Sequence, residues 1–143
     1  MTRPYLPLPV FGAAVTTTSV SDPLLETVLG GRYAITRRIA RGGMATVYEA
    51  TDRRLSRTVA VKVMHEGLGD DDDFAGRFDR EARSAARLNH PNIVSVFDRG
   101  NDDGRPYIVM EYVPGITMRR VISRQAPIVP IRALSMIEDV LLA

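Results

Sequence analysis

The chain has 143 residues, of which 45% are hydrophobic and 25% charged, a composition typical of a folded globular domain. Its 19 basic and 17 acidic residues nearly cancel and are interleaved along most of the sequence, so the charge does not favour nucleic-acid binding. The absence of cysteine excludes disulfides, thiolate zinc sites and cysteine nucleophiles. The two histidines, His65 and His90, lack metal-ligand spacing, so we expect no metal site.

Residues 1–29 are predicted to form a disordered leader. Residues 4–21 carry no charge, as in a signal peptide or a membrane span. However, three prolines interrupt this segment, and no apolar run approaches ~20 residues. We therefore expect no membrane segment in this chain and a cytoplasmic location. Order is expected to begin near Gly31.

The remaining sequence predicts three strands, a long helix, two strands and two helices, in that order. Alternating residues indicate the first strands, and apolar residues at helical spacing indicate the helices. The predicted strands are residues 32–40, 46–52, 58–64, 92–98 and 106–113, with a turn at 99–105, and the predicted helices are residues 74–88, 117–123 and 131–143. Because strands and helices do not alternate as βαβ units, the pattern predicts an α+β fold with an antiparallel sheet.

The only lysine of the chain, Lys62, lies inside the apolar run of the third predicted strand. Side chains alternate along a strand, so Lys62 shares a face with Ala60 and Met64 and is expected to be partly desolvated. Glu81 lies on or beside the apolar stripe of the long helix and is its candidate partner. Two interpretations stay open on these residues alone: an ion pair that joins strand to helix, or a lysine that extends to solvent beside a glutamate at the rim.

A glycine turn, Gly42 and Gly43, lies between the first two predicted strands. Glycines at a hairpin tip let backbone N–H groups approach phosphate, although most Gly-Gly turns only reverse the chain. No G-K-[ST] follows, and the turn leads into a strand. These features exclude a Walker A motif and a Rossmann fingerprint.

Taken together, these motifs resemble the N-terminal lobe of a eukaryotic-like serine/threonine protein kinase, most similar to actinobacterial members. The matching text is "GRYAITRRIARGGMATVYEATDRRLSRTVAVKV", "RFDREARSAARLNHPNIVSVFD" and "PYIVMEYVPGITM". The resemblance implies a five-stranded antiparallel sheet with one long helix in residues 30–113. It also implies the hinge exit and the first helices of a truncated C-terminal lobe in residues 114–143.

The resemblance also implies a role for each matching position. Lys62 would contact the α- and β-phosphates of ATP, and Glu81 would pair with Lys62. The loop that covers the nucleotide would be Ile39, Ala40, Arg41, Gly42, Gly43, Met44, Ala45, Thr46 and Val47. The adenine contacts would be Val47, Ala60, the gatekeeper Met110, and the backbone of Glu111 and Val113.

The sequence departs from the family pattern in two ways. Ala40 and Ala45 replace two glycines of the covering loop, and Ala40 is expected to weaken ATP binding. The sequence also contains no H-R-D and no D-F-G motif, so the family's catalytic aspartate and Mg²⁺ ligands are absent. We expect a transferase fragment that binds ATP but does not transfer phosphate alone.

The alternative hypothesis is a non-catalytic module that pairs with a kinase N-lobe, in a homo- or hetero-association. Arg32, Leu55 and Asp98 fall where similar kinases associate, although an ordinary surface is the favoured interpretation of these three residues. An apolar stripe on the last predicted helix is expected to be exposed and to make the chain marginally stable and prone to associate. The stripe consists of Ile131, Leu134, Ile137 and Leu141.

Overall fold

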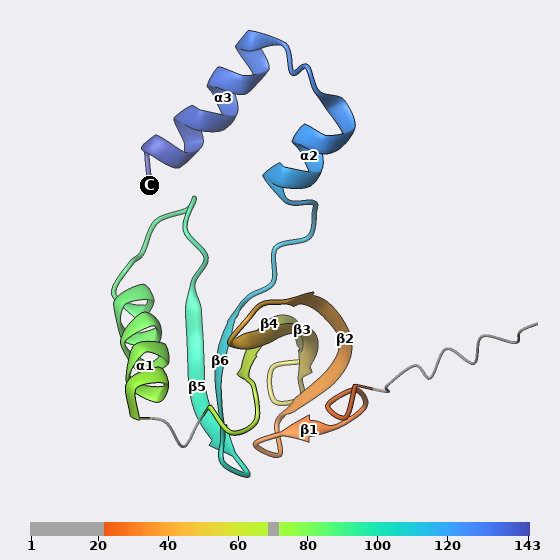
Figure 1. The fold of residues 1–143 in the computed structure, drawn as a ribbon, viewed down its shortest axis with the longest axis vertical. Coiled ribbons are helices and arrows are strands. Elements are labelled where there is room, and N and C mark those ends of the chain that lie inside the picture. The colour runs from red at the N-terminus through yellow and green to blue at the C-terminus, as the bar shows by residue number, and fades with distance from the viewer. Residues whose placement is uncertain (1–21, 69–71) are drawn as a thin grey trace, which may run out of the picture.

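Figure 1 shows a curled antiparallel sheet with one helix beside it and two further helices at the opposite end of the molecule. The computed structural model describes residues 22–68 and 72–143. The strands are β1 (Val28–Leu29), β2 (Tyr33–Arg41), β3 (Ala45–Asp52), β4 (Arg57–Met64), β5 (Val96–Asp102) and β6 (Arg105–Glu111), and the helices are α1 (Asp72–Ala86), α2 (Met118–Gln125) and α3 (Pro130–Leu141). The strand order is β1-β2-β3-β4-β6-β5, and every neighbouring pair is antiparallel, which confirms the predicted α+β class.

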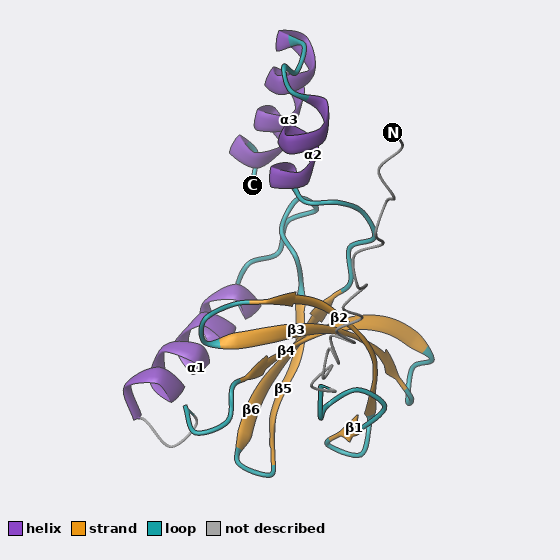
Figure 2. Cartoon of the chain, turned by 45° about the vertical axis from the view of Figure 1, so that its right-hand side comes forward, coloured by secondary structure: helices purple, strands orange, loops and turns teal. Residues whose placement is uncertain are grey.

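The curl of the sheet is centred on the β2–β3 hairpin. The pairing of β2 with β3 is irregular at two places, between Ile35 and Arg37 and between Arg38 and Ala40. Such irregularities bend a strand and increase its twist. Figure 2 shows the strongly curved β2 and β3 above the straighter β5 and β6.

Strand β4 lies inside the sheet and separates two hydrophobic clusters. Val59, Val61 and Val63 are buried in one cluster, together with aromatic residues of neighbouring strands. Met64 points to the other face and is buried against Phe78 of α1. The predicted alternation of side chains along this strand is therefore confirmed.

Helix α1 covers the Met64 face of the sheet with Phe78 and Ala82, which are both buried. We predicted that the helix continues to Leu88, but it ends at Ala86, and Leu88 is 52% exposed. Beyond the helix, the Leu88 N–H donates to the Ala85 carbonyl, three residues back. Because of this tighter turn, Leu88 does not lie on the apolar face of α1. Its spacing from Phe78 and Ala82 in the sequence therefore did not indicate a helical position.

The prediction of five strands was wrong, because a sixth strand, β1, lies within the predicted leader. Val28 and Leu29 pair with Ala34 and Tyr33 of β2. The side chain of Leu29 is buried in the cluster beside β4. A strand of two residues is too short to show an alternating pattern, so this pairing left no signal in the sequence.

Residues 22–27 of the predicted leader are also ordered, since the Tyr48 hydroxyl donates to Asp22 and Leu24 packs against the core. The expectation that order begins near Gly31 was therefore wrong. Residues 1–21 lie outside the described residues.

The predicted bounds of the last two strands were also wrong. Strand β5 begins at Val96, and its pairing with β6 continues to Asp102 and Arg105. The turn is therefore only Asp103 and Gly104, which both have positive φ (53° and 78°). An Asp-Gly pair is the usual choice for a two-residue hairpin turn, and this local signal outweighs the polar character of the flanking residues.

Helices α2 and α3 lie apart from the sheet in both views (Figures 1 and 2). Thr117 caps α2, since its hydroxyl accepts from the Arg120 N–H, and Pro130 begins α3. Neither helix buries a residue, and the predicted apolar stripe of α3 is exposed. Within residues 22–68 and 72–143, no helix has the length and apolar character needed to cross a membrane.

The ring of Tyr107 on β6 fits between two glycines. A Cβ atom on Gly100 of β5 would lie 2.9 Å from the Tyr107 Cε1 atom and closer still to Cζ and the hydroxyl oxygen. A Cβ atom on Gly30, which has φ of 55°, would also overlap that hydroxyl. Tyr107 is buried and meets the ring of Tyr33 edge-on, so it cannot move aside.

We predict that Gly100→Ala lowers the free energy of unfolding by about 2 kcal/mol, because the added methyl group overlaps a buried ring. The control is Gly76→Ala in α1, where an added Cβ meets no atom within 4 Å and helix propensity favours alanine by up to ~1 kcal/mol. Chemical denaturation of both variants measures the difference. Equal stability of the two variants would contradict the packing argument.

Candidate functional site

Lys62 and Glu81 form an ion pair that joins β4 to α1. The Lys62 Nζ atom lies 2.6 Å from the Glu81 Oε1 atom. The Phe78 ring of α1 also lies near the ammonium, with its centroid 5.8 Å from Nζ. Of the two interpretations left open by the sequence, the structure therefore selects the ion pair.

The pair is open to solvent, since 25% of the Lys62 side chain and 58% of the Glu81 side chain are exposed. An ion pair of this exposure contributes at most about 1 kcal/mol to stability. An ammonium group carries three N–H donors, of which Glu81 takes one. The exposed Lys62 therefore keeps donors for a further anion.

The predicted covering loop is the tip of the β2–β3 hairpin, which lies beside Lys62 in the sheet. Val47 of β3 is the direct neighbour of Lys62 in β4. The tip is closed by a hydrogen bond from the Gly42 N–H to the Ala45 carbonyl (2.8 Å). A Cβ atom on Gly43 would meet no atom within 4 Å, so the turn is open on that side. The structure thus places Val47, the last residue of the predicted loop, next to Lys62 in the sheet.

The two alanines that replace family glycines are accommodated differently. Ala45 is buried in the cluster with Met64 and Phe78, where its methyl group fills space under α1. Ala40 is exposed in β2, opposite Val47. Neither is among the described residues with positive φ, so neither requires glycine for its backbone conformation.

Two of the predicted adenine contacts, Ala60 and Met110, lie next to each other on one face of β4 and β6. Ala60 is the direct neighbour of Met110, and both side chains are at least half-buried. Glu111 ends β6, and its N–H donates to the Ser95 carbonyl (2.8 Å), while its carboxylate accepts from the Ser95 N–H. Val113 follows beyond the strand and is exposed. The structure therefore places Ala60 and Met110 together, two residues along β4 from Lys62.

Two of the three predicted interface residues belong to a second ionic network. Both Arg32 Nε and Nη2 donate to the fully buried Asp52 carboxylate, at 2.8 and 2.7 Å. Asp98 accepts from Arg32 (3.4 Å) and from the Tyr33 hydroxyl (2.5 Å). Asp52 also accepts from the N–H of Leu55, the third predicted residue. Sequence analysis missed Asp52 and Tyr33, because neither stands out from its strand pattern.

This network shifts the pKa values of its members. The hydrogen bonds from the Arg32 guanidinium lower the pKa of Asp52 to about 2, against the opposing effect of burial. Burial and the hydrogen bond to Asp98 raise the pKa of Tyr33. Asp52 therefore stays ionised in the folded chain, and Tyr33 stays protonated.

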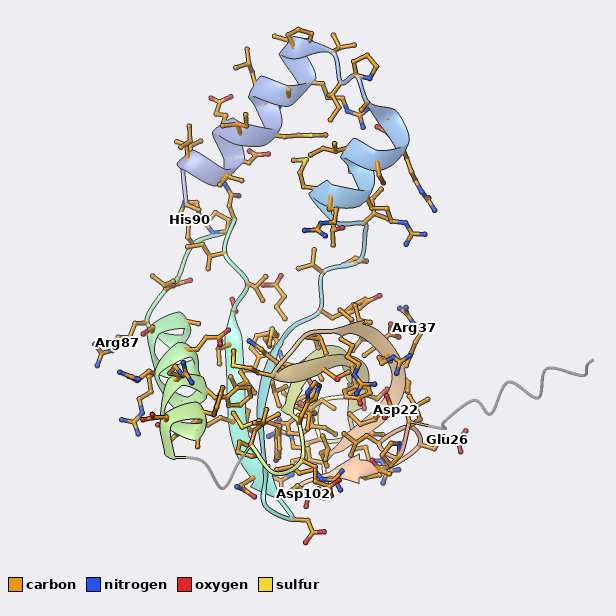
Figure 3. All side chains as sticks on the ribbon, in the orientation of Figure 1. Asp22, Glu26, Arg37, Arg87, His90 and Asp102 are labelled. Carbon is orange, nitrogen blue, oxygen red and sulfur yellow. The ribbon has the colours of Figure 1, made fainter. Side chains whose placement is uncertain are left out.

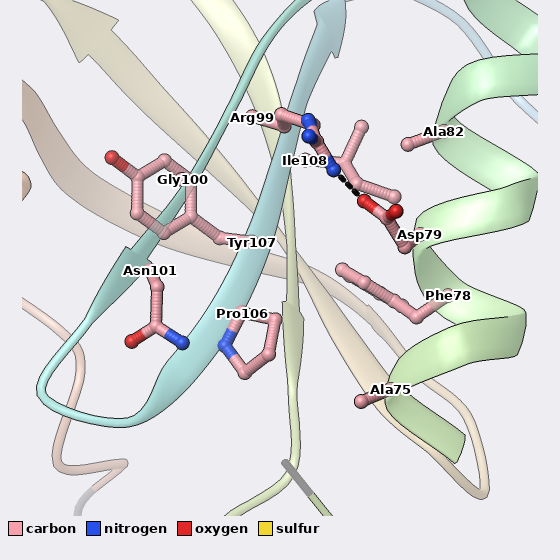
Figure 4. Close-up of a pocket in the computed structure, with 10 residues that line it drawn as sticks. All are labelled: Ala75, Phe78, Asp79, Ala82, Arg99, Gly100, Asn101, Pro106, Tyr107 and Ile108. Carbon is pink, nitrogen blue, oxygen red and sulfur yellow. Dashed lines mark ion pairs between the residues drawn. The ribbon is translucent and has the colours of Figure 1, made fainter. Parts of the chain in front are cut away.

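A cavity of about 410 Å³ lies between α1 and the β5–β6 hairpin (Figure 4). Its walls are mainly apolar, with Phe78 and Ala82 on α1 facing Ile108 on β6. An ion pair between Asp79 and Arg99 lies at its edge. Neither Lys62 nor Glu81 lines the cavity, so it is separate from the Lys62 site.

His90, which lacks metal-ligand spacing to the other histidine, lies in the segment that reaches from α1 toward α3 (Figure 3). Its Nδ1 atom accepts from the Asn92 N–H, and the Asn92 side-chain amide donates to the Asp139 carbonyl of α3 (2.7 Å). His90 therefore supports a connection between the two parts of the molecule. Among residues 22–68 and 72–143, no three histidines or carboxylates cluster as metal ligands do.

The curled sheet, the helix beside it and the following helices form the N-terminal lobe and the first C-lobe helices of a protein kinase fold. A family model described as protein kinase domain matches residues 33–143. The chain belongs to the protein kinase family.

Its relatives include bacterial serine/threonine kinases. The chain is 47% identical over 115 residues to the serine/threonine-protein kinase PrkC of Bacillus subtilis, and the match covers 80% of this chain and 18% of the relative. It is 41% identical over 120 residues to PknL of Mycobacterium tuberculosis, covering 84% of this chain and 30% of PknL. The solved PknI kinase domain of M. tuberculosis matches with a TM-score of 0.68 and 32% identity, covering 81% of this chain and 47% of that structure. The chain thus spans less than a third of the length of these curated relatives.

We predict that the melting temperature falls as the pH decreases from about 4 to about 2. Because Arg32 lowers the pKa of folded Asp52 from 3.8 to about 2, the carboxylate stabilises the fold fully above pH 3.8, and this contribution disappears as the pH falls through the folded value. Asp52→Asn should remove this contribution and lower the melting temperature at pH 7 by roughly 5–10 °C.

The control for this prediction is Glu66→Gln. Glu66 also pairs with an arginine, Arg105 at 2.8 Å, but is largely exposed, so its loss should change the melting temperature by less than roughly 3 °C. Thermal melts at each pH measure both variants. A melting curve of Asp52→Asn that matches wild type at pH 7 would rule out the stabilising role of the network.

Proposed function

We propose that this chain is the ATP-binding lobe of a serine/threonine protein kinase, which transfers the ATP γ-phosphate to serine or threonine of a protein. The observation that carries the proposal is the 2.6 Å ion pair between Lys62 and Glu81 beside the glycine hairpin. The proposal is also supported by the membership of the chain in the protein kinase family and by its similarity to bacterial serine/threonine kinases. Because the chain covers a small part of those kinases, the activity of a whole kinase is part of the proposal.

The proposed roles follow from the donors and surfaces of the site. Glu81 holds the Lys62 ammonium in place, and the remaining N–H donors of Lys62 bind the α- and β-phosphates. Backbone N–H groups of the glycine hairpin cover the phosphates. Ala60 and Val47 provide an apolar surface for the adenine ring, and the chain after Met110 provides backbone hydrogen-bonding groups.

Phosphoryl transfer requires a base for the hydroxyl nucleophile and ligands for Mg²⁺, which neutralises phosphate charge when bound. The 143 residues contain neither the H-R-D nor the D-F-G motif that supplies these groups in kinases. We therefore propose that this chain binds ATP but does not transfer phosphate alone.

We predict that Lys62→Met lowers the affinity for ATP roughly tenfold, because it removes the charged donors to phosphate. It should change the free energy of unfolding by less than ~1 kcal/mol, because the ion pair is partly exposed. Isothermal titration with ATP and chemical denaturation of the 143-residue chain measure the two effects.

The matched control for Lys62 is Arg83→Met, which removes an ion-paired cation on the exposed side of α1. This variant should bind ATP as wild type does. If wild type does not bind ATP, or if Lys62→Met binds it equally well, the proposed function is wrong. Transfer of labelled phosphate from ATP to a protein by the chain alone would disprove only the proposed inactivity.

A second candidate function is a non-catalytic module that pairs with a kinase N-lobe. The observation in its favour is Leu55, which is 59% exposed directly beside the Arg32–Asp52–Asp98 network. Since Arg32 and Asp98 are already paired with each other, the association would depend mainly on the apolar contact of Leu55.

For this second candidate, we predict that sedimentation velocity shows a dimer that Leu55→Asp converts to monomer, because burial of an unpaired carboxylate opposes association. Leu88→Asp, at a similarly exposed leucine after α1, is the control and should leave the dimer intact. A wild-type chain that stays monomeric, or a dimer that survives Leu55→Asp, would refute this interface.

A further inference from the structure

His65 contacts the glycine hairpin at three points. It is the first residue after β4, three positions beyond Lys62. Its Nε2 atom lies 3.0 Å from the Thr46 hydroxyl, and its Nδ1 atom lies 3.2 Å from the Gly43 carbonyl oxygen. Its backbone N–H donates to the Met44 carbonyl (2.9 Å). One residue thus binds the tip of the hairpin and the start of β3.

The chemistry of the imidazole ring matches both side-chain contacts. A carbonyl oxygen can only accept, so Nδ1 carries the proton that is donated to Gly43. In the neutral ring Nε2 then accepts from the Thr46 hydroxyl, and in the charged ring the hydroxyl turns and accepts from Nε2. Both contacts can therefore form in either charge state of the ring.

The hairpin needs such a restraint, because Gly42 and Gly43 have no side chains with which to hold the turn. Both glycines are exposed, and a Cβ atom on Gly43 would have no neighbour within 4 Å. Glycine loses more conformational freedom on ordering than any other residue, so an unrestrained turn opposes binding. Thr46 is 5% exposed and gives His65 a fixed anchor.

We propose that His65 is a positioning residue that holds the backbone of Gly43 and Met44 ready to receive the phosphates of a nucleotide. This inference rests on the proposed function, because it assigns the restraint to the same ATP site. Strand β4 then provides the phosphate-binding ammonium, and the residue immediately after it provides the restraint on the covering loop. His65 itself touches the loop and not the nucleotide.

The first test compares ATP with adenosine, which has no phosphate. His65→Ala should lower the affinity for ATP by about fivefold and leave the affinity for adenosine within about twofold. His65→Asn should restore most of the ATP affinity, because its amide N–H can reach the Gly43 carbonyl as Nδ1–H does. Thr46→Val, which keeps the shape and removes the hydroxyl, should give an intermediate loss. Isothermal titration of the full chain measures each affinity.

The control is His90→Ala, which removes the other histidine of the chain, far along the sequence from the hairpin. Its ratio of ATP to adenosine affinity should equal that of wild type. If His65→Ala weakens ATP and adenosine equally, or weakens neither, the positioning role is wrong.

The second test needs no nucleotide. Amide hydrogen exchange at Met44 and Ala45 should be faster in His65→Ala than in wild type and should slow again in His65→Asn. Unchanged exchange would overturn the inference even if ATP binds. If wild type fails to bind ATP, the proposed function fails, and the role of His65 in phosphate binding is overturned with it. The exchange data then show only whether the restraint on the hairpin exists.

Discussion

Strand β4 carries the constraint on which the rest of the structure depends, because its two faces have different tasks. Val59, Val61 and Val63 fill the cluster inside the curled sheet, and this packing fixes the strand. The alternation that buries the valines also turns Lys62 toward α1. A shift of the strand by one residue would turn the ammonium into the valine cluster and turn the valines toward α1. The position of the charged site is thus set by the packing of the core.

The two ionic networks of the sheet differ in burial and therefore in what they can do. Asp52 is fully buried and saturated by Arg32 and by backbone N–H groups, so it stabilises the structure and has no capacity for a ligand. Lys62 and Glu81 are partly exposed and contribute little to stability. The same chemistry thus supports the fold in one place and leaves donors for an anion in the other.

The sequence predicted those features that depend on one strong pattern. The alternation in β4 and the unusual positions of Lys62 and Glu81 pointed to an ion pair but left a solvent-exposed lysine equally open, and the resemblance to protein kinases favoured the pair. Strand β1 was missed because its pairing depends on backbone hydrogen bonds in a two-residue segment. Asp52 was missed because it does not stand out from the pattern of its strand, and its partner Arg32 lies in the turn before β2. The role of His65 was not predicted, because its contacts with Thr46 and Gly43 depend on the curl of the hairpin and leave no pattern in the sequence.

The packing of Tyr107 between Gly30 and Gly100 links Gly30 to two positions of the β5–β6 hairpin that lie far from it in the sequence. Gly100 is required only while the ring is present, since the ring fills the space that a Cβ atom would occupy, whereas Gly30 is also favoured by its positive φ. The three positions therefore constrain one another as substitutions accumulate. Loss of the tyrosine would open space beside both glycines, and a side chain acquired at Gly100 would first require a smaller residue at position 107. Substitutions at these three positions are therefore expected to occur in a preferred order.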